Sequence, residues 1–128
     1  MARKEIIRLA ERELQIMKVV WRHGPATVRE VQEALHDTQP LAYTTVLTMM
    51  RILEQKGYLE HKEQDRTFVY HARVTESQAS RSLVRDLVER VFDGSPGLLV
   101  QRLLAEEQIP PEELERLKQM IAEKEKGA

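Results

Sequence analysis

The sequence predicts a mainly α-helical protein with one small β-hairpin near its middle. Apolar residues recur at helical spacing in six segments of the 128-residue chain. Between the third and fourth segments, residues 58–72 change to the two-residue period of β-strands, interrupted by the polar turn Gln64-Asp65-Arg66. With 41% hydrophobic and 32% charged residues, the chain suits one compact domain, or a domain of about 70 residues with a helical appendage.

The first two helices are predicted from their apolar faces and their end signals. The first covers about residues 10–22 and ends at Gly24-Pro25. The second begins at Thr27 as N-cap, with Glu30 completing a capping box, and ends near residue 37, before Pro40. The residues expected on the buried faces of the two helices are Leu14, Met17, Val20, Trp21, Val28, Val31 and Leu35.

Residues 41–57 predict a third helix with two dissimilar faces, ending at Gly57 and leading directly into a strand. Its outer face has no acidic residue between residues 41 and 53, and three of its positions are threonine, a mediocre helix former. Short hydroxyls and an arginine suit the major groove of DNA, where they contact phosphates or base edges; the alternative is an ordinary solvated face. The candidate contact residues are Tyr43, Thr44, Thr45, Thr48 and Arg51.

The order helix, helix, helix, hairpin is typical of a winged helix-turn-helix, in which the hairpin lies beside the recognition helix. In the hairpin, Lys62 and Arg66 are candidate phosphate contacts, or else charges that keep an edge strand soluble. Tyr43 either stacks on a sugar or supports the start of the helix. The remaining large side chains of this part are expected in the core, namely Trp21, Met49, Met50 and Phe68.

Beyond residue 73 the sequence predicts three more helices, separated by Asp93-Gly94 and by Pro110-Pro111. One protomer leaves much of their apolar surface uncovered, so we expect a symmetric homodimer through residues 75–125. Residues 1–73 are then the binding domain and residues 74–128 the dimerisation domain. A small-molecule pocket between the helices is the alternative. The expected dimer contacts are Leu83, Leu87, Val91, Phe92, Leu99, Leu103, Leu114, Leu117 and Ile121.

Several classes of function are disfavoured by what the sequence lacks. With no cysteine, disulfides, thiolate zinc sites and cysteine nucleophiles are excluded. The four histidines, at positions 23, 36, 61 and 71, are scattered and lack metal-ligand spacing, so no metal or cofactor is expected. Neither a nucleophile elbow nor a phosphate-binding loop occurs, which argues against an enzyme. No apolar run approaches about 18 residues, so we expect a cytoplasmic protein without membrane contact.

Charge is distributed unevenly along the chain. Residues 1–73 carry 12 Lys and Arg against 10 Asp and Glu, a charge of +2, and residues 74–128 carry 8 against 11, a charge of −3, which together give the net charge of −1. A mildly basic front half and an acidic back half fit a binding domain followed by an assembly segment.

The motifs LAERELQIMKVVW (residues 9–21), TVREV (27–31), AYTTVLT (42–48), Leu53-x-x-Lys56-Gly57 and Tyr70 resemble the penicillinase-repressor family (BlaI/MecI/CopY). The resemblance runs nearly end to end. It implies a bacterial transcriptional repressor, a homodimer whose winged helices bind palindromic operator DNA and control a resistance or stress operon. By the same resemblance, Thr44, Thr45, Thr48 and Arg51 belong to the recognition helix, and Lys62 and Arg66 to the wing.

Two departures from that family limit what the resemblance implies. Members that control β-lactam resistance are cleaved at an Asn-Phe bond in the dimerisation region, and Arg102-Leu103 takes that place here. Copper-responsive members carry a cysteine motif, which this chain lacks. Release by a sensor protease, a ligand or a metal therefore stays open. The alternative functions are a ligand- or metal-sensing regulator, and a protein-interaction module, which predicts acidic residues on the exposed recognition face.

Overall fold

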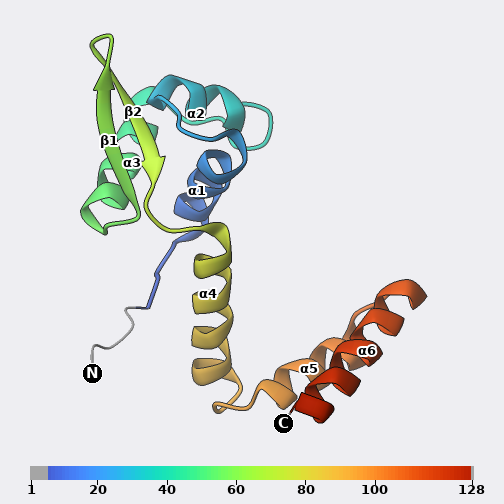
Figure 1. The fold of residues 1–128 in the computed structure, drawn as a ribbon. Coiled ribbons are helices and arrows are strands. Elements are labelled where there is room, and N and C mark those ends of the chain that lie inside the picture. The colour runs from blue at the N-terminus through green and yellow to red at the C-terminus, as the bar shows by residue number, and fades with distance from the viewer. Residues whose placement is uncertain (1–5, 128) are drawn as a thin grey trace, which may run out of the picture. The chain divides into compact units, whose positions relative to one another are not determined.

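The computed structural model describes residues 6–127, and its contacts divide the chain into two compact units that meet between Asp86 and Leu87. Six helices and one hairpin follow in the predicted order (Figure 1), which confirms the predicted fold class. The assignment of residues 1–73 to binding and residues 74–128 to dimerisation concerns function and stays a prediction. The elements are α1 (Glu11–His23), α2 (Val28–Leu35), α3 (Tyr43–Gln55), β1 (Leu59–Gln64), β2 (Thr67–Ala72), α4 (Glu76–Val91), α5 (Pro96–Glu106) and α6 (Pro111–Gly127).

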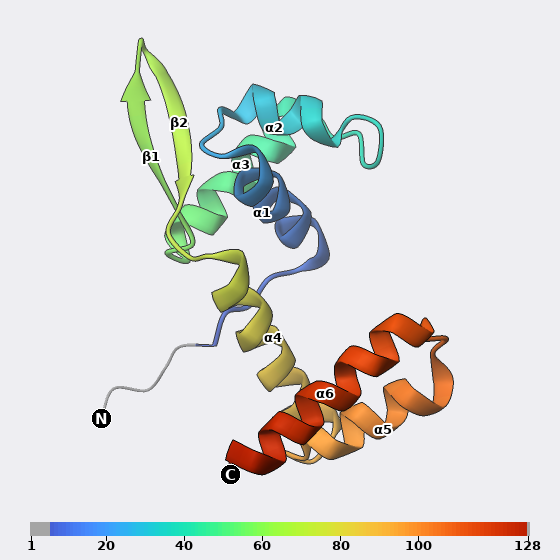
Figure 2. The ribbon, with the colours of Figure 1, turned by 45° about the vertical axis from the view of Figure 1, so that its right-hand side comes forward.

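The core of the first unit lies where α1, α2 and α3 pack on one another and on the inner end of the hairpin (Figure 2). The predicted apolar faces of the three helices supply this core, and Trp21 and Met49 pack at its edge. Burying these side chains provides the main stabilisation of the unit. The largest fully buried residues are Ile16, Met17, Val31, Val46, Met50, Leu53, Leu59 and Tyr70.

The hairpin is antiparallel, with Gln64 opposite Thr67 at its tip. Asp65 and Arg66 form the two-residue turn with φ of 50° and 66°. Positive φ at both central positions is the type I′ geometry that matches the twist of two strands. At the inner end, Ala26 forms an isolated antiparallel β-bridge with Tyr70, with reciprocal backbone hydrogen bonds of 3.0 and 2.8 Å. The hairpin is thereby attached to the segment between α1 and α2.

The expectation that Phe68 belongs to the core is wrong, because its side chain is 44% exposed. Only the inner end of the hairpin, at Leu59 and Tyr70, lies against the helices and is buried. Phe68 lies two residues further out, where the His61 ring lies against it, with the ring centroids 4.4 Å apart. A two-residue period identifies which residues share a face of a strand, but not how far a helix covers that face.

Side-chain caps fix the beginnings of α2 and α5 as the sequence predicts. Thr27 and Glu30 form the expected capping box, in which Glu30 N donates to Thr27 Oγ1 (3.1 Å) and Thr27 N donates to Glu30 Oε1 (2.9 Å). These hydrogen bonds to Thr27 hold the pKa of Glu30 below its ordinary value of 4.5. At α5, the Ser95 hydroxyl accepts from Leu98 N (3.3 Å), with Pro96 at the first helical position.

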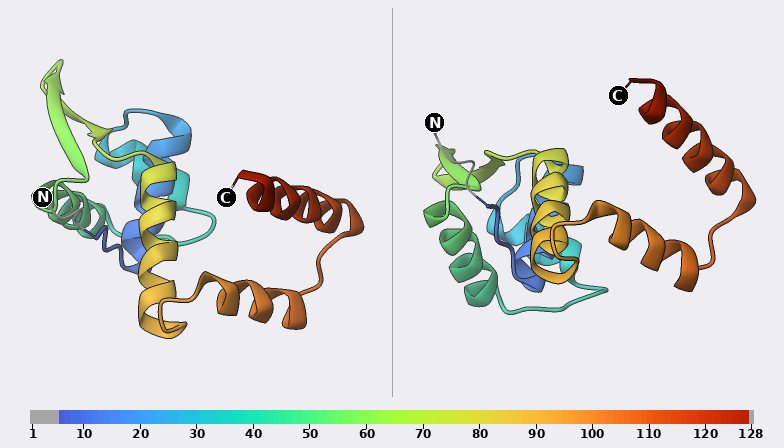
Figure 3. Two further views of the ribbon diagram at one scale, coloured as in Figure 1. Left: turned by 60° about the horizontal axis from the view of Figure 1, so that its bottom comes forward. Right: turned by 90° about the horizontal axis from the view of Figure 1, so that it is seen from below.

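The second unit contains the end of α4 with α5 and α6. Both α5 and α6 are described along their whole length, and neither contains a buried residue. In Figure 3 the chain reverses at the segment that joins them, so that α5 and α6 run in opposite directions. No helix within residues 6–127 is long and apolar enough to span a membrane. The large exposed apolar residues of the unit are Leu87, Val91, Leu98, Val100, Leu103, Leu104, Leu114, Met120 and Ile121.

Candidate nucleic-acid interface

Helix α3 is held at both ends by hydrogen bonds. Before it begins, Gln32 of α2 donates from Nε2 to the carbonyl of Leu41 (3.1 Å), which fixes the turn between the two helices. At its end, Tyr58 N donates to Leu53 O (3.0 Å) and Gly57 N to Glu54 O (3.0 Å). This is the Schellman arrangement, and it requires the φ of +87° that Gly57 adopts. The helix is therefore presented as a rigid element.

The outer face of α3 carries the side chains that the sequence singles out. Thr44, Thr48 and Arg51 recur at intervals of four and three residues and are all exposed. Tyr43 is 44% exposed at the first turn, and Thr45 is half-buried at the edge of the face. The opposite face is buried in the core. The structure thus brings Thr44, Thr48 and Arg51 onto one exposed face of the helix, with Tyr43 and Thr45 at its two edges.

A carboxylate at the end of α3 joins this helix to the hairpin. Glu54 accepts from His61 of β1, with its two oxygens 2.8 and 2.7 Å from Nδ1. It also accepts from the backbone N of His61 (3.2 Å). This pair adds a side-chain contact between the hairpin and the end of α3.

Sequence reasoning did not identify Glu54 and His61 as an interacting pair. Seven positions separate them across the Gly57 turn, and neither helical nor strand periodicity links them. The contact follows only once the register of the hairpin is known, with His61 opposite Tyr70 on the inward face. A histidine on the inward face of a predicted hairpin is the one signal that could have suggested a polar partner on the adjoining helix.

The cationic side chains of the interface find no carboxylate partner in the part of the chain that the structure describes. Among residues 6–127, Arg51, Lys62 and Arg66 form no ion pair. Lys62 points to the hairpin face opposite that of His61, and Arg66 lies at the tip. The tip also carries exposed Glu63 and Asp65. The wing therefore presents charges of both signs, whereas the outer face of α3 presents only Arg51.

Tyr70 lies beneath this surface and remains neutral. Burial raises the pKa of its phenol above the ordinary value of 10, and the carboxylate of Glu54 raises it further, while the guanidinium of Arg51 lowers it. A neutral, buried phenol packs as part of the core. Its role here is to support the junction between α3 and the hairpin.

The model of the penicillinase repressor family matches residues 9–123 of the 128-residue chain. The chain belongs to the penicillinase repressor family. It is 31% identical over 120 residues to the penicillinase repressor of Bacillus licheniformis, covering 94% of both proteins. It is 30% identical over 125 residues to the transcriptional regulator BlaI of Mycobacterium tuberculosis (strain CDC 1551 / Oshkosh), covering 96% of this chain and 89% of that protein.

A solved structure supports the winged-helix assignment of the N-terminal part. The solution structure of monomeric Bacillus licheniformis BlaI in complex with the blaP half-operator superposes with a TM-score of 0.51 at 36% identity. The match covers 59% of this chain and 93% of that one. The relatives named here are transcriptional regulators, a family that is not enzymatic.

Metal binding finds no support in the described part of this family member. Within residues 6–127, no three His, Cys, Asp or Glu side chains gather closely enough to hold a metal ion. Of the four histidines, His61 is engaged by Glu54, and His23 lies 3.8 Å from a Glu30 oxygen. The candidate site is therefore a surface of hydroxyls and cations on α3 and the wing.

Proposed function

We propose that this chain is a homodimeric transcriptional repressor that binds palindromic operator DNA in the cytoplasm. The observation that carries the proposal is the outer face of α3, with its exposed threonines and with Arg51, which forms no ion pair among residues 6–127. This face lies between the turn that Gln32 holds and the wing that Glu54 and His61 join to α3. Membership of the penicillinase repressor family and the half-operator complex of a relative support the same assignment.

On DNA, α3 enters the major groove and the wing lies along the neighbouring backbone. Thr44 and Thr48 offer hydroxyls to phosphates or base edges and methyls to thymine. Arg51 offers two parallel hydrogen bonds to a guanine or a phosphate. Tyr43 and Thr45 flank these contacts, and Lys62 and Arg66 add phosphate contacts from the wing.

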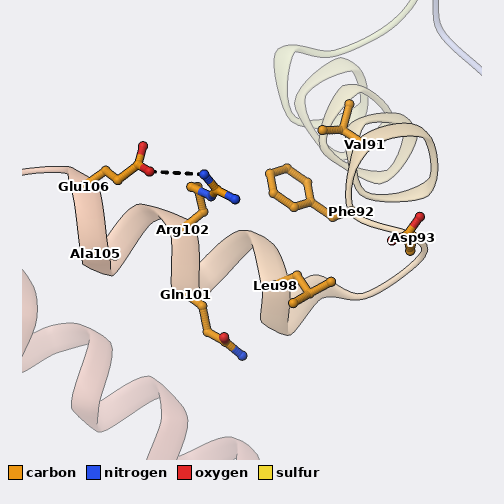
Figure 4. Close-up of a pocket in the computed structure, with 8 residues that line it drawn as sticks. All are labelled: Val91, Phe92, Asp93, Leu98, Gln101, Arg102, Ala105 and Glu106. Atoms are coloured by element: carbon orange, nitrogen blue, oxygen red, sulfur yellow. Dashed lines mark hydrogen bonds and ion pairs between the residues drawn. The ribbon is translucent and has the colours of Figure 1, made fainter.

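The second half of the proposal is that another copy of the chain covers the apolar faces of the second unit. Val91 is 62% exposed and Met120 64%, and exposed apolar surface on this scale is typical of an interface. A hollow of about 700 Å³ lies between the end of α4 and α5. In Figure 4 the ring of Phe92 points across it, beside the ion pair of Arg102 and Glu106 (3.1 Å). A helix of the second copy suits such a hollow.

The predicted dimer contacts lie on α4, α5 and α6, except Phe92, which directly follows α4. In the single chain, Leu83, Phe92, Leu99 and Leu117 are half-buried, and the others are exposed. Two linked winged helices engage two half-sites at once, which raises the affinity for a palindrome far above that of one half-site. Occupancy of the operator then blocks transcription, and the target is a resistance or stress operon.

Release of DNA follows from anything that breaks the dimer. Arg102-Leu103 lies inside α5, and both side chains are exposed. A sensor protease that acts at this bond first has to unwind α5, because a peptide bond inside a helix is hydrogen-bonded and inaccessible to a protease that binds extended chains. Cutting α5 removes α6 and with it much of the apolar surface of the second unit.

The test uses a labelled duplex from the region upstream of the gene that encodes this chain. We expect a specific shift in fluorescence anisotropy that weakens as salt rises, with competitor DNA of unrelated sequence failing to displace the protein. Arg51→Ala is expected to weaken binding by about 1–3 kcal/mol, and Lys18→Ala, on α1, serves as the charge-matched control. Absence of a specific, salt-dependent shift would sink the proposal.

Sedimentation velocity tests the dimer separately. The chain has a mass of 14.9 kDa, and we expect a species of twice that mass at micromolar concentration. A monomer at every accessible concentration would contradict the assembly proposed here, while leaving binding of a half-site by the winged helix to be judged by the anisotropy titration.

A further inference from the structure

The segment immediately before α1 is tied to two elements that are distant in sequence. Ile7 N donates to Ser82 Oγ of α4 (2.9 Å), and Arg8 N donates to the hydroxyl of Tyr58, just after α3 (2.9 Å). Lys56 Nζ, at the end of α3, donates to the carbonyl of Arg8 (3.3 Å). We call residues 7–10 the N-terminal strap. It connects the end of α3 with the middle of α4.

The strap is anchored to α1 through Glu13, a buried carboxylate whose partner Lys56 is partly exposed. Glu13 is only 6% exposed, and both of its carboxylate oxygens lie 2.9 Å from Lys56 Nζ. Glu13 also accepts from the backbone N of Ala10 (2.8 Å) at the end of the strap. A buried carboxylate needs such partners, so the strap has one position against α1 and α3.

The beginning of α4 has its own attachments to α1. Trp21 Nε1 donates to the carbonyl of Val74 (2.8 Å), and Arg22 pairs with Glu76 (3.3 Å). These contacts hold the first turn of α4, whereas Ser82 lies further along the helix. The contact with the strap therefore holds α4 at a second point, and two points on a helix determine its direction.

The direction of α4 matters because this one helix belongs to both units. Residues 76–86 of this single helix belong to the first unit, and residues 87–91 belong to the second. In the proposed dimer, α4 is the connection through which the dimerisation helices hold each winged helix. The direction in which α4 leaves the winged helix therefore affects the distance between the two recognition helices.

We propose that the N-terminal strap is a positioning element that fixes α4 against the end of α3 and so sets the half-site spacing that the dimer accepts. This inference rests on the proposed function. Without the hydrogen bonds of Ser82 and Tyr58, α4 keeps its attachment to α1 at Trp21 and Arg22 and the burial of Ala79, but it loses the hydrogen bond that holds it at Ser82. Such a dimer still binds DNA, but it discriminates less against operators whose half-sites are further apart or closer together.

The test compares the wild type with a Tyr58→Phe, Ser82→Ala double variant. Each substitution removes one acceptor oxygen and leaves the carbon framework in place. Ser80→Ala, on the exposed surface of α4, is the matched control. The DNA probes are the duplex bound upstream of the gene, the same duplex with one or two base pairs inserted or deleted between its half-sites, and an isolated half-site.

We expect the ratio of Kd values between altered and native spacing to fall about tenfold in the double variant, as the loss of two hydrogen bonds implies. The affinity for the half-site, and the dissociation constant of the dimer measured by sedimentation, should stay within about twofold of the wild type. The Ser80→Ala control should discriminate between spacings as well as the wild type does. A purely stabilising role for the strap predicts a lower melting temperature with unchanged discrimination.

Two results would overturn the inference while leaving the proposed function intact. One is an unchanged spacing ratio in the double variant, and the other is a loss of half-site affinity equal to the loss on the full operator. If the wild type binds none of the duplexes, the proposed function fails and the inference fails with it. The wild-type titration therefore separates the two failures.

Discussion

Replacing Lys56 with methionine should destabilise the protein more than replacing its partner Glu13 with glutamine, although both variants break the same ion pair. The Glu13 side chain is 8% exposed, whereas that of Lys56 is 36% exposed. Lys56→Met leaves a buried carboxylate without its cation, a situation that costs about 3–5 kcal/mol. We expect about 3 kcal/mol, the lower end, because Ala10 N still donates to the carboxylate.

In the reverse variant, the ammonium group of Lys56 remains partly in water and is free to hydrate. Glu13→Gln also keeps an oxygen that can accept from Ala10 N. The free energy of unfolding then falls by the contribution of one charge-assisted hydrogen bond, less what the ammonium gains by hydration. We expect a net loss of about 1–2 kcal/mol. The difference between the variants arises from unequal burial of the two partners.

Urea unfolding monitored by circular dichroism measures both variants, at one protein concentration because a dimer gains stability with concentration. Lys18→Met, at a site with no ion pair among residues 6–127, is the control and should change stability by less than about 0.5 kcal/mol. Equal losses in the two variants, or a larger loss for Glu13→Gln, would refute the reasoning from burial.

Three further changes have definite expectations. Asp65→Asn combined with Arg66→Gly suits the positive φ values of the hairpin turn, and should raise the free energy of unfolding by about 1 kcal/mol in urea titrations. Thr27→Ala should cost about 1 kcal/mol at pH 7. Because Thr27 lowers the pKa of Glu30, the stability that these hydrogen bonds contribute is complete above about pH 4.5 and is lost as the pH falls through the lowered pKa. The difference in free energy of unfolding between wild type and Thr27→Ala should therefore narrow in acid. A difference that stays constant with pH would argue against the capping box. Leu103→Glu should shift the sedimenting species toward the 14.9 kDa monomer, whereas an unaffected dimer would remove α5 from the interface.

Local sequence signals were sufficient for the secondary structure. Helical periodicity located the six helices, and the Thr27 capping box and Gly57 located helix ends, because each depends on residues within one or two turns. The two-residue period located the hairpin for the same reason. Even the exposed face of α3 followed from the spacing of its buried side, since Val46, Met50 and Leu53 define the opposite surface.

Contacts between distant segments were beyond these signals. Phe68 was expected in the core because it alternates correctly, but the hairpin extends beyond the helices that could cover it. The pair of Glu54 and His61 depends on strand register. The bond from Ile7 to Ser82 joins residues 75 positions apart. Such contacts are set by the tertiary arrangement, which no local pattern encodes.

Hydroxyl-radical footprinting on the duplex upstream of the gene tests the central claim most directly. Two winged helices held by one dimer should protect two backbone patches related by the operator dyad, with centres one helical turn of about 10 base pairs, or a multiple of it, apart. Arg51→Ala should weaken both patches together. A single protected patch at saturation, or a footprint that Arg51→Ala leaves unchanged, would contradict a dimer that reads its operator through α3.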